Sequence, residues 1–131
     1  ETYLLSVIFL HNSFCDMIFD YDNIPFEEFP NFKGGEGVMK AKMYFDSDCR
    51  FFRAVLHPGA SIGMHCHTDS CEAIYILKGA GKALLEGGES EAVSAGQCHY
   101  CPRGCSHSLV NTGTDDLEFF AVVSNCQPLQ K

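Results

Sequence analysis

Positive charge is scarce in this chain of 131 residues. Lys and Arg together number 9 against 17 Asp and Glu, so the formal net charge is −8. Proteins that bind nucleic acids carry basic patches that meet the phosphates, and an acidic surface does not adhere to anionic membranes. The composition therefore argues against a nucleic acid or a membrane as partner.

Long hydrophobic segments are also lacking. The one unusual apolar run covers residues 3–10, whereas a membrane-spanning helix needs about 20 residues. No segment has the basic start, apolar middle and small-residue cleavage site of a secretory signal. We interpret residues 3–10 as a strand or short helix packed on the rest of the domain or on a second subunit.

Cysteine, by contrast, is abundant, with 8 residues. A secreted disulfide scaffold is normally shorter and contains more than about 8–10% Cys. A chain of this length with 46% hydrophobic residues can bury a core without covalent links. We therefore expect most of the thiols to be reduced and the protein to be cytoplasmic.

Short apolar or alternating segments recur along the chain and are closed by Gly, Pro, Asn or Asp. This pattern is typical of an all-β domain, and no repeat or linker divides it. The expected strands are 38–45, 51–56, 72–78, 82–86, 91–93, 98–101, 107–111 and 117–123. Gly87 and Gly88 are expected to form a hairpin turn, because both can adopt positive φ.

We expect residues 38–126 to form one barrel, residues 1–37 an N-terminal strand and irregular arm, and residues 127–131 a C-terminal tail. Pro25 and Pro30 prevent a single helix in the arm, which is expected to wrap the barrel with one short turn near residues 25–29. Some strands are apolar on both faces and must be covered on both. We therefore expect a homodimer, in which the N-terminal segment could take part.

Two histidines, His65 and His67, are spaced two residues apart in an extended segment. Strand side chains repeat every two residues, so both rings point to the same side. Glu72 can return to that side only if the chain turns, and residues 68–70 supply turn chemistry. His107 follows a Pro-x-Gly turn that opens another strand.

These segments resemble the two sequence motifs of the cupin family. The first motif, G-x5-H-x-H-x4-E-x6-G, is met at every fixed position by Gly59, His65, His67, Glu72 and Gly79. The second motif, G-x5-P-x-G-x2-H-x3-N, is met by Gly96, Pro102, Gly104, His107 and Asn111. The short gap between the motifs is similar to that of small single-domain bacterial cupins.

The resemblance implies an RmlC-like double-stranded β-helix, or jelly-roll barrel, with one divalent transition metal inside it. The implied ligands are His65, His67, Glu72 and His107, a donor set that suits several transition metals. Four protein ligands leave two positions open on an octahedral ion, whereas they would fill a tetrahedral zinc site. We therefore expect Mn, Fe or Ni, with Zn as an ion that a crystal could contain. The alternative is that the rings are only hydrogen-bonded and hold no metal.

The function implied is that of a metal-dependent enzyme, an isomerase, lyase or dioxygenase acting on a chelating oxygenated metabolite. The small number of basic residues argues against phosphorylated substrates. The alternative is a module that binds a small metabolite, or the metal itself, without turnover. The sequence names no catalytic residue.

Four further residues are candidates for the pocket or for the surroundings of the metal: His99, Tyr100, Tyr75 and Arg103. Parity places His99 on the face opposite Tyr100, but it does not say which of the two faces inward. The two tyrosines could equally be packing residues. Arg103 could bind a carboxylate through two parallel hydrogen bonds, although its place in a turn favours exposure.

The cysteines near the motifs allow two interpretations. Cys98, Cys101 and Cys105 could suggest a separate zinc or iron–sulfur site, but no second pair matches them. We interpret all three as small apolar fillers. Cys66 and Cys71 could approach the metal or pair with each other, although alternation turns Cys66 away from the two histidines.

Overall fold

The computed structural model describes residues 17–126, and in that range it contains ten strands and three short 3-10 helices. The apolar run at residues 3–10 and the tail at 127–131 lie outside the described residues. The strands are β1 (Glu27–Pro30), β2 (Val38–Phe45), β3 (Cys49–Leu56), β4 (Ser61–Cys66), β5 (Ser70–Lys78), β6 (Ala80–Leu85), β7 (Ser90–Ser94), β8 (Cys98–Cys101), β9 (Ser106–Val110) and β10 (Leu117–Asn125). The 3-10 helices are η3 (Tyr21–Asn23), η4 (Phe32–Gly34) and η5 (Glu86–Gly88). Within residues 17–126, no helix is long and apolar enough to cross a bilayer.

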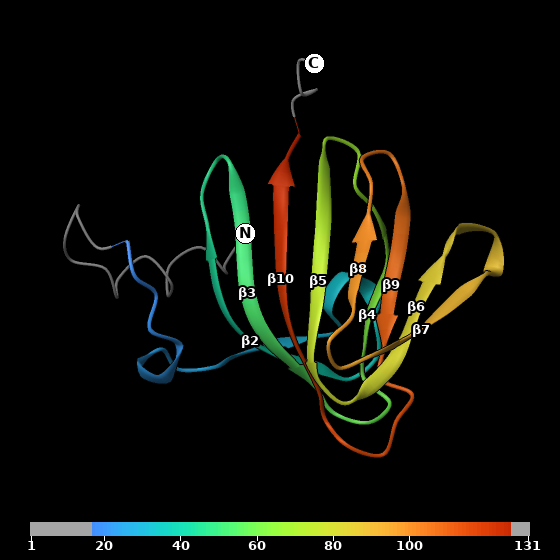
Figure 1. Ribbon diagram of the computed structural model, residues 1–131, viewed down its shortest axis with the longest axis horizontal. Coiled ribbons are helices and arrows are strands. Elements are labelled where there is room, and N and C mark those ends of the chain that lie inside the picture. The colour runs from blue at the N-terminus through green and yellow to red at the C-terminus, as the bar shows by residue number, and fades with distance from the viewer. Residues whose placement is uncertain (1–16, 127–131) are drawn as a thin grey trace.

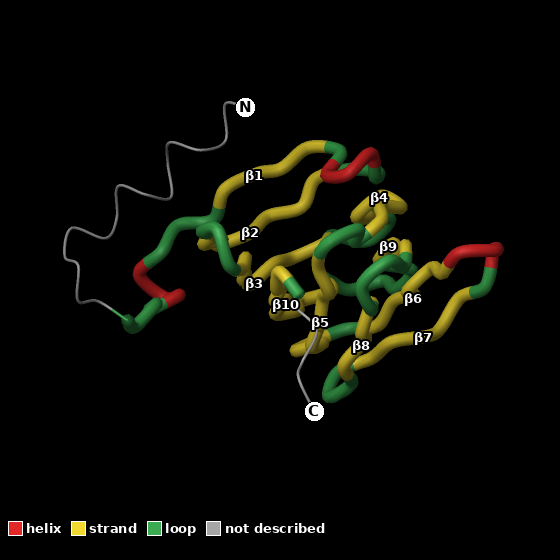
Figure 2. The backbone as a smooth tube through the Cα atoms, turned by 90° about the horizontal axis from the view of Figure 1, so that it is seen from above, coloured by secondary structure: helices red, strands yellow, loops and turns green. Residues whose placement is uncertain are grey.

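The strands form two antiparallel sheets (Figure 1). The larger sheet has the order β1-β2-β3-β10-β5-β8, and the smaller has the order β4-β9-β6-β7. Figure 2, a view from above, shows the strands of the larger sheet in a row from β1 to β8. The strands β4, β9, β6 and β7 of the smaller sheet lie together on one side of this row. The expectation of an all-β jelly-roll barrel is confirmed.

All eight expected strands are present, with ends that differ by at most two residues, and β1 and β4 are additional. The expected hairpin turn is confirmed, with Gly87 at φ 83° and Gly88 at φ 87°. The expectation of only a short turn near residues 25–29 is wrong, because Glu27–Pro30 is strand β1, paired with β2. Pro30 is compatible with this pairing because β1 is an edge strand and ends there.

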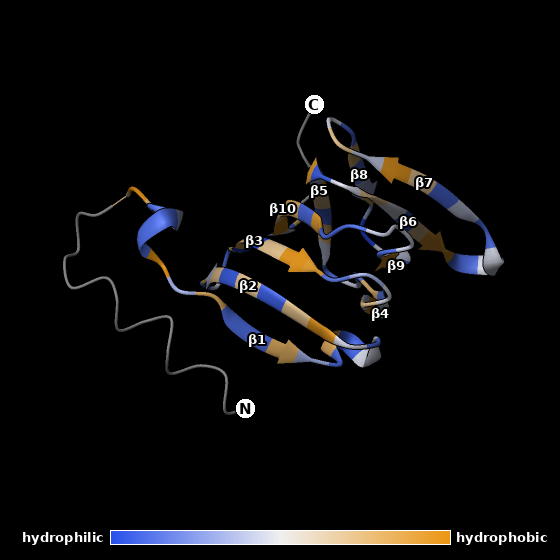
Figure 3. Ribbon diagram, turned by 90° about the horizontal axis from the view of Figure 1, so that it is seen from below, coloured by the Kyte–Doolittle hydropathy of each residue, from blue (hydrophilic) through white to orange (hydrophobic). Residues whose placement is uncertain are grey.

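The core lies between the sheets and is formed by alternate residues of the central strands (Figure 3). Phe52 of β3 and Phe119 of β10 are both almost completely buried, and their rings meet edge to face with centroids 6.1 Å apart. Burial of each such side chain stabilises the fold by roughly 1.5–3 kcal/mol. The buried apolar side chains of both sheets form one core, which holds the two sheets together.

The outer face of the larger sheet is covered in part by the N-terminal arm. Phe19 contacts Tyr44 and Phe51 at centroid distances of 4.8 and 4.9 Å, and Tyr21 contacts Phe120 at 6.0 Å. Part of the apolar outer face that the sequence predicts to need a cover is therefore packed within the same chain.

The loop around η4 is fixed against β4 by two glycines. A Cβ on Gly63 would overlap the carbonyl oxygen of Lys33, and a Cβ on Gly35 would overlap that of Ser61. Only glycine permits two backbones to approach this closely. This contact sets the position of the η4 loop beside the histidines of β4.

Candidate metal centre

His65 and His67 reach the interior because β4 is irregular. Ile62 and His65 both face inward although they are three residues apart, which a regular strand with a period of two does not allow. The pairing with β9 shifts its register between these two residues. This irregularity turns His65 inward, and His67 follows on the same side just after the strand ends.

Glu72 and His107 come from the two different sheets. Glu72 lies on β5 after a bend at residues 68–69 and is 3% exposed. His107 lies on β9, directly opposite His65 in the register, and is 1% exposed. The structure thus brings four potential ligands, one from the larger sheet and three from the smaller sheet and its adjoining loop, to one place.

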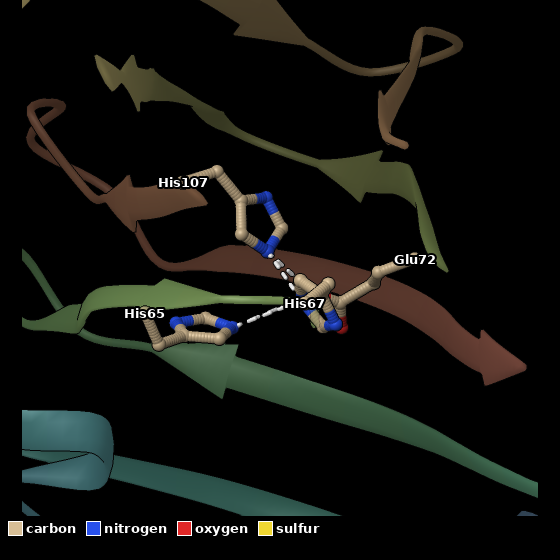
Figure 4. A group of neighbouring side chains, drawn as sticks. All are labelled: His65, His67, Glu72 and His107. Atoms are coloured by element: carbon tan, nitrogen blue, oxygen red, sulfur yellow. Dashed lines mark hydrogen bonds and ion pairs between the residues drawn. The ribbon is translucent and has the colours of Figure 1, made fainter. Parts of the chain in front are cut away.

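The four side chains point their donor atoms toward a common centre (Figure 4). The Nε2 atoms of His65 and His67 are 3.1 Å apart, and those of His67 and His107 are 3.0 Å apart. Oε1 of Glu72 lies 2.8 Å from Nε2 of His107, 3.3 Å from that of His67 and 3.9 Å from that of His65. All four donor atoms lie within 4.8 Å of one another, so the cluster could hold a metal ion.

These separations can be compared with those around an ion. Metal–ligand bonds of about 2.1 Å place neighbouring donors of an octahedron about 3.0 Å apart and opposite donors about 4.2 Å apart. In a tetrahedron every pair would be about 3.4 Å apart. Separations of 2.8 to 3.9 Å between Glu72 and the three rings are of the size found between ligands of one ion.

Each imidazole is held through its other nitrogen. Nδ1 of His65 lies 2.7 Å from the carbonyl oxygen of Gly63, and Nδ1 of His67 lies 2.9 Å from Oγ of Ser70. Because a carbonyl oxygen can only accept, Nδ1 of His65 donates, which leaves a lone pair on Nε2 in the neutral ring. Such contacts orient histidines that bind a metal.

The buried carboxylate is ionised despite its burial. Burial would raise the pKa of Glu72, but hydrogen bonds from His107 and His67 outweigh it and lower the pKa from 4.5 to about 2. Burial lowers the pKa of His65, against the opposing effect of its hydrogen bond to Gly63. An anionic Glu72 beside a neutral His65 is the protonation state that binds a cation.

A cavity of about 270 Å³ opens beside the cluster. Its wall includes three of the four potential ligands and several apolar residues. It also carries two cationic side chains, Lys33 and Arg50. A small metabolite could therefore reach the cluster from this side.

The other candidate residues lie outside this cavity wall. His99 is buried, and its Nε2 lies 2.9 Å from Nδ1 of His107. Tyr75 and Tyr100 are 46% and 58% exposed, on the outer face of the larger sheet. Arg103 is exposed and donates a hydrogen bond of 3.2 Å to the carbonyl oxygen of Cys126.

The cysteine interpretation holds only in part. Cys101 is buried, as a filler should be, and burial raises the pKa of its thiol to about 11. The same interpretation is wrong for Cys98 and Cys105, which are both exposed. Cys98 lies on the outer face of β8, and Cys105 lies in the turn before β9. Among residues 17–126, no metal-ligand group contains a thiol.

Sequence reasoning missed several residues that surround the cluster. Ser70 was assigned only to a turn, yet it contacts His67. Arg50 was not singled out, although it shares a strand face with the buried Phe52. Alternation along β3 was the only signal in the sequence that could have placed Arg50 on the inner face. It is ambiguous, because Arg53 occupies an equivalent place on the opposite face.

The cupin domain family matches residues 52–123 of the chain. The chain belongs to the cupin family. The similarity extends to solved structures at low identity: an RmlC-like cupin from Shewanella frigidimarina superposes with a TM-score of 0.69 at 15% identity, covering 86% of this chain and 93% of that one.

Three known proteins are more similar in sequence. An oxalate-binding protein from Thermotoga maritima is 37% identical over 103 residues, which cover 74% of this cupin and 84% of the relative. The crystal structure of a predicted oxalate decarboxylase from Thermotoga maritima gives a TM-score of 0.78 at 34% identity, covering 84% of this chain and 100% of that one. A glucose-6-phosphate isomerase from Thermococcus gammatolerans is 33% identical over 90 residues, but these cover only 47% of that enzyme.

Proposed function

We propose that this cupin binds one divalent transition metal on His65, His67, Glu72 and His107 and uses it to hold a small chelating carboxylate. The observation that carries the proposal is the convergence of these four donors beside an open cavity. The ligand class is supported by the relative that is named an oxalate-binding protein. Oxalate is therefore the ligand with which to test the proposal.

The donor set of three imidazoles and one carboxylate suits a six-coordinate ion such as Mn, Fe or Ni, whereas four protein ligands would fill the shell of tetrahedral Zn. When bound, such an ion supplies a Lewis acid that polarises the oxygens of a ligand. Four protein ligands would leave two positions on it, which matches the two oxygens of a chelating carboxylate.

The residues around the donors would keep the site in its binding state. Gly63 and Ser70 hold the rings of His65 and His67 through Nδ1, so both Nε2 atoms stay directed at the centre. The apolar side chains of Phe52 and Val123 form part of the cavity wall and exclude water from one side. A drier wall strengthens the attraction between the site and an anionic ligand.

A second candidate is turnover of the bound ligand, as an isomerase, lyase or dioxygenase. It is supported by the 34% identity to a protein described as a predicted oxalate decarboxylase. We assign no catalytic residue for this reaction. Incubation of the metal-loaded protein with carbon-13-labelled oxalate, followed by NMR, distinguishes turnover from binding alone.

The test of the proposed function begins with protein purified without a nickel column. We expect elemental analysis to give one transition-metal ion per chain. Calorimetric titration should give oxalate binding to the Mn-loaded protein and none after treatment with a chelator. Equal oxalate binding with and without metal, or a chain that takes up no metal, would contradict the proposal.

We also propose that the protein is a homodimer in the cytoplasm. The dimer is supported by Tyr75, Leu77 and Tyr100, which stay exposed on the outer face of the larger sheet. The location is supported by the composition, since a secreted disulfide scaffold is normally shorter and richer in Cys than this chain. Light scattering after gel filtration tests the first statement, and cell fractionation tests the second.

A further inference from the structure

The cavity beside the cluster concentrates positive charge that is scarce elsewhere. The chain has 9 Lys and Arg in all, and two of them, Lys33 and Arg50, line this cavity. The acidic groups on the same wall are Glu72 and Asp46. These four charges balance, so the charge of a divalent ion in the cluster would be left for a ligand to neutralise.

Arg50 lies on the inner face of the larger sheet. It is in register with Val123 of β10, and Val123 is in register with Glu72 of β5. Arg50 and Glu72 therefore belong to one row across the sheet, with only Val123 between them. Adjacent strands are about 4.8 Å apart, so the two backbones are roughly 10 Å apart. A ligand held at the cluster lies within the reach of a long arginine side chain on this row.

The guanidinium of Arg50 has no polar partner. Within residues 17–126 it forms no hydrogen bond or ion pair, and it lies over the ring of Phe45, 5.5 Å from Cζ to the centroid. Arg53, on the other face of the same strand, pairs with Glu118 at 3.6 Å. A partly buried guanidinium without a carboxylate is free to bind one from a ligand.

Lys33 is presented to the cavity by a strained loop. Its φ is +55°, in the left-handed region that lysine rarely adopts. The close approach of Gly63 to the Lys33 carbonyl fixes this loop against β4. Strained residues that the surrounding structure holds in place are frequent at binding sites.

We propose that Arg50 and Lys33 form an anion subsite facing the cluster and that it selects dianionic ligands, small dicarboxylates, over monoanionic chelators. The inference rests on the proposed function, since the ligand must first be held at the cluster. A dicarboxylate that chelates through one oxygen of each carboxylate keeps two oxygens free. Arg50 binds these oxygens, and Lys33 adds a second positive charge.

The test compares two ligands of similar size on the Mn-loaded protein by calorimetry. Oxalate has two carboxylates, and glycolate has one carboxylate and a hydroxyl. We expect Arg50→Gln to weaken oxalate binding by roughly 10- to 100-fold, the usual effect of losing a charged hydrogen bond. Glycolate binding should weaken by no more than about threefold. Arg50→Lys should fall between the wild type and Arg50→Gln for oxalate, and Lys33→Gln should weaken oxalate binding to a smaller extent than Arg50→Gln.

The matched control is Arg53→Gln, on the same strand but on the outer face. It should bind oxalate as the wild type does, and all variants should keep one metal ion per chain. An Arg50→Gln or Arg50→Lys protein that binds oxalate as tightly as the wild type, or that loses both ligands equally, would overturn the subsite. A wild-type protein that takes up metal but binds neither ligand would instead overturn the proposed function.

Discussion

Nε2 of His99 lies 2.9 Å from Nδ1 of His107, whose Nε2 lies 2.8 Å from Oε1 of Glu72. The rings of His99 and His107 are stacked at an interplanar angle of 23°. If His107 binds a metal through Nε2, its proton must be on Nδ1 and is donated to His99. His99 must then accept through Nε2, which places its own proton on Nδ1.

Replacement of His99 by Phe should weaken metal binding by roughly 10- to 100-fold, the usual cost of losing a partner of a ligating histidine. The ring volume is kept, but the acceptor for His107 is lost. His99→Gln, whose amide oxygen can accept, should lose less. Competition with a fluorescent chelator measures both, and equal affinities for Phe and Gln would show that His99 acts only through packing.

His67→Ala should abolish stoichiometric metal, because its Nε2 lies 3.1 Å from that of His65 and 3.0 Å from that of His107, in the middle of the donor set. The control is His57→Ala, which removes an exposed ring that pairs with Asp116 at 2.6 Å, away from the cluster. Elemental analysis of both purified proteins gives the answer. Full occupancy in the His67 variant would mean that the ligand assignment is wrong.

The stability of the metal-free protein should depend on Glu72 at acid pH. Its pKa is about 2 in the folded protein against an ordinary 4.5, so the folded state favours the ionised form. This contribution is present above pH 4.5 and is lost as the pH falls toward about 2. Urea unfolding in the presence of a chelator measures the free energy of unfolding at each pH. This free energy should decrease less between pH 4.5 and about 2 for Glu72→Gln than for the wild type. An equal decrease in the free energy of unfolding of both proteins over this pH range would contradict the assigned pKa.

Gly63→Ala should destabilise the fold by about 1–3 kcal/mol, since its Cβ would overlap the Lys33 carbonyl oxygen and displace the η4 loop. Gly113→Ala is the control, because its Cβ would lie 3.2 Å from the Ala80 carbonyl oxygen and requires only a small adjustment. Urea unfolding measures both. Equal losses would show that the close contact of η4 with β4 contributes little.

Cys71 and Cys126 should form a disulfide on mild oxidation, because their Sγ atoms are 2.8 Å apart. A diazene oxidant such as diamide would take up the two thiol hydrogens as the sulfur–sulfur bond forms. Mass spectrometry should find the loss of two hydrogens and a peptide joined through these residues. Cys126→Ser should prevent it, and an unchanged mass in the wild type would contradict the expectation.

The strand and turn pattern predicted an all-β fold, and the resemblance to the two cupin motifs implied that four side chains meet inside it. The spacing of His65 and His67 places both rings on one side of an extended segment. The turns before Glu72 and before His107 each concern one further side chain, and the structure brings all four together. Their role as metal ligands stays a prediction.

The surroundings of the cluster could not be predicted in the same way. On β3 the two faces both combine one arginine with apolar residues, so alternation does not say whether Arg50 or Arg53 faces inward. On β8, alternation likewise does not say whether His99 or Tyr100 faces inward. In β4 the register shift between Ile62 and His65 breaks the period of two, and only pairing with β9 reveals it. In each case, contacts between distant segments decide the orientation.

The donors belong to different layers of the sandwich, with His65 and His107 on the smaller sheet and Glu72 on the larger. An ion bound to all of them would connect the layers at the end where the cavity opens. Binding and removal of the metal ion should then change how often the two sheets open locally. Slower amide hydrogen exchange along β4 and β9 would report occupancy of the site even when no small molecule is present.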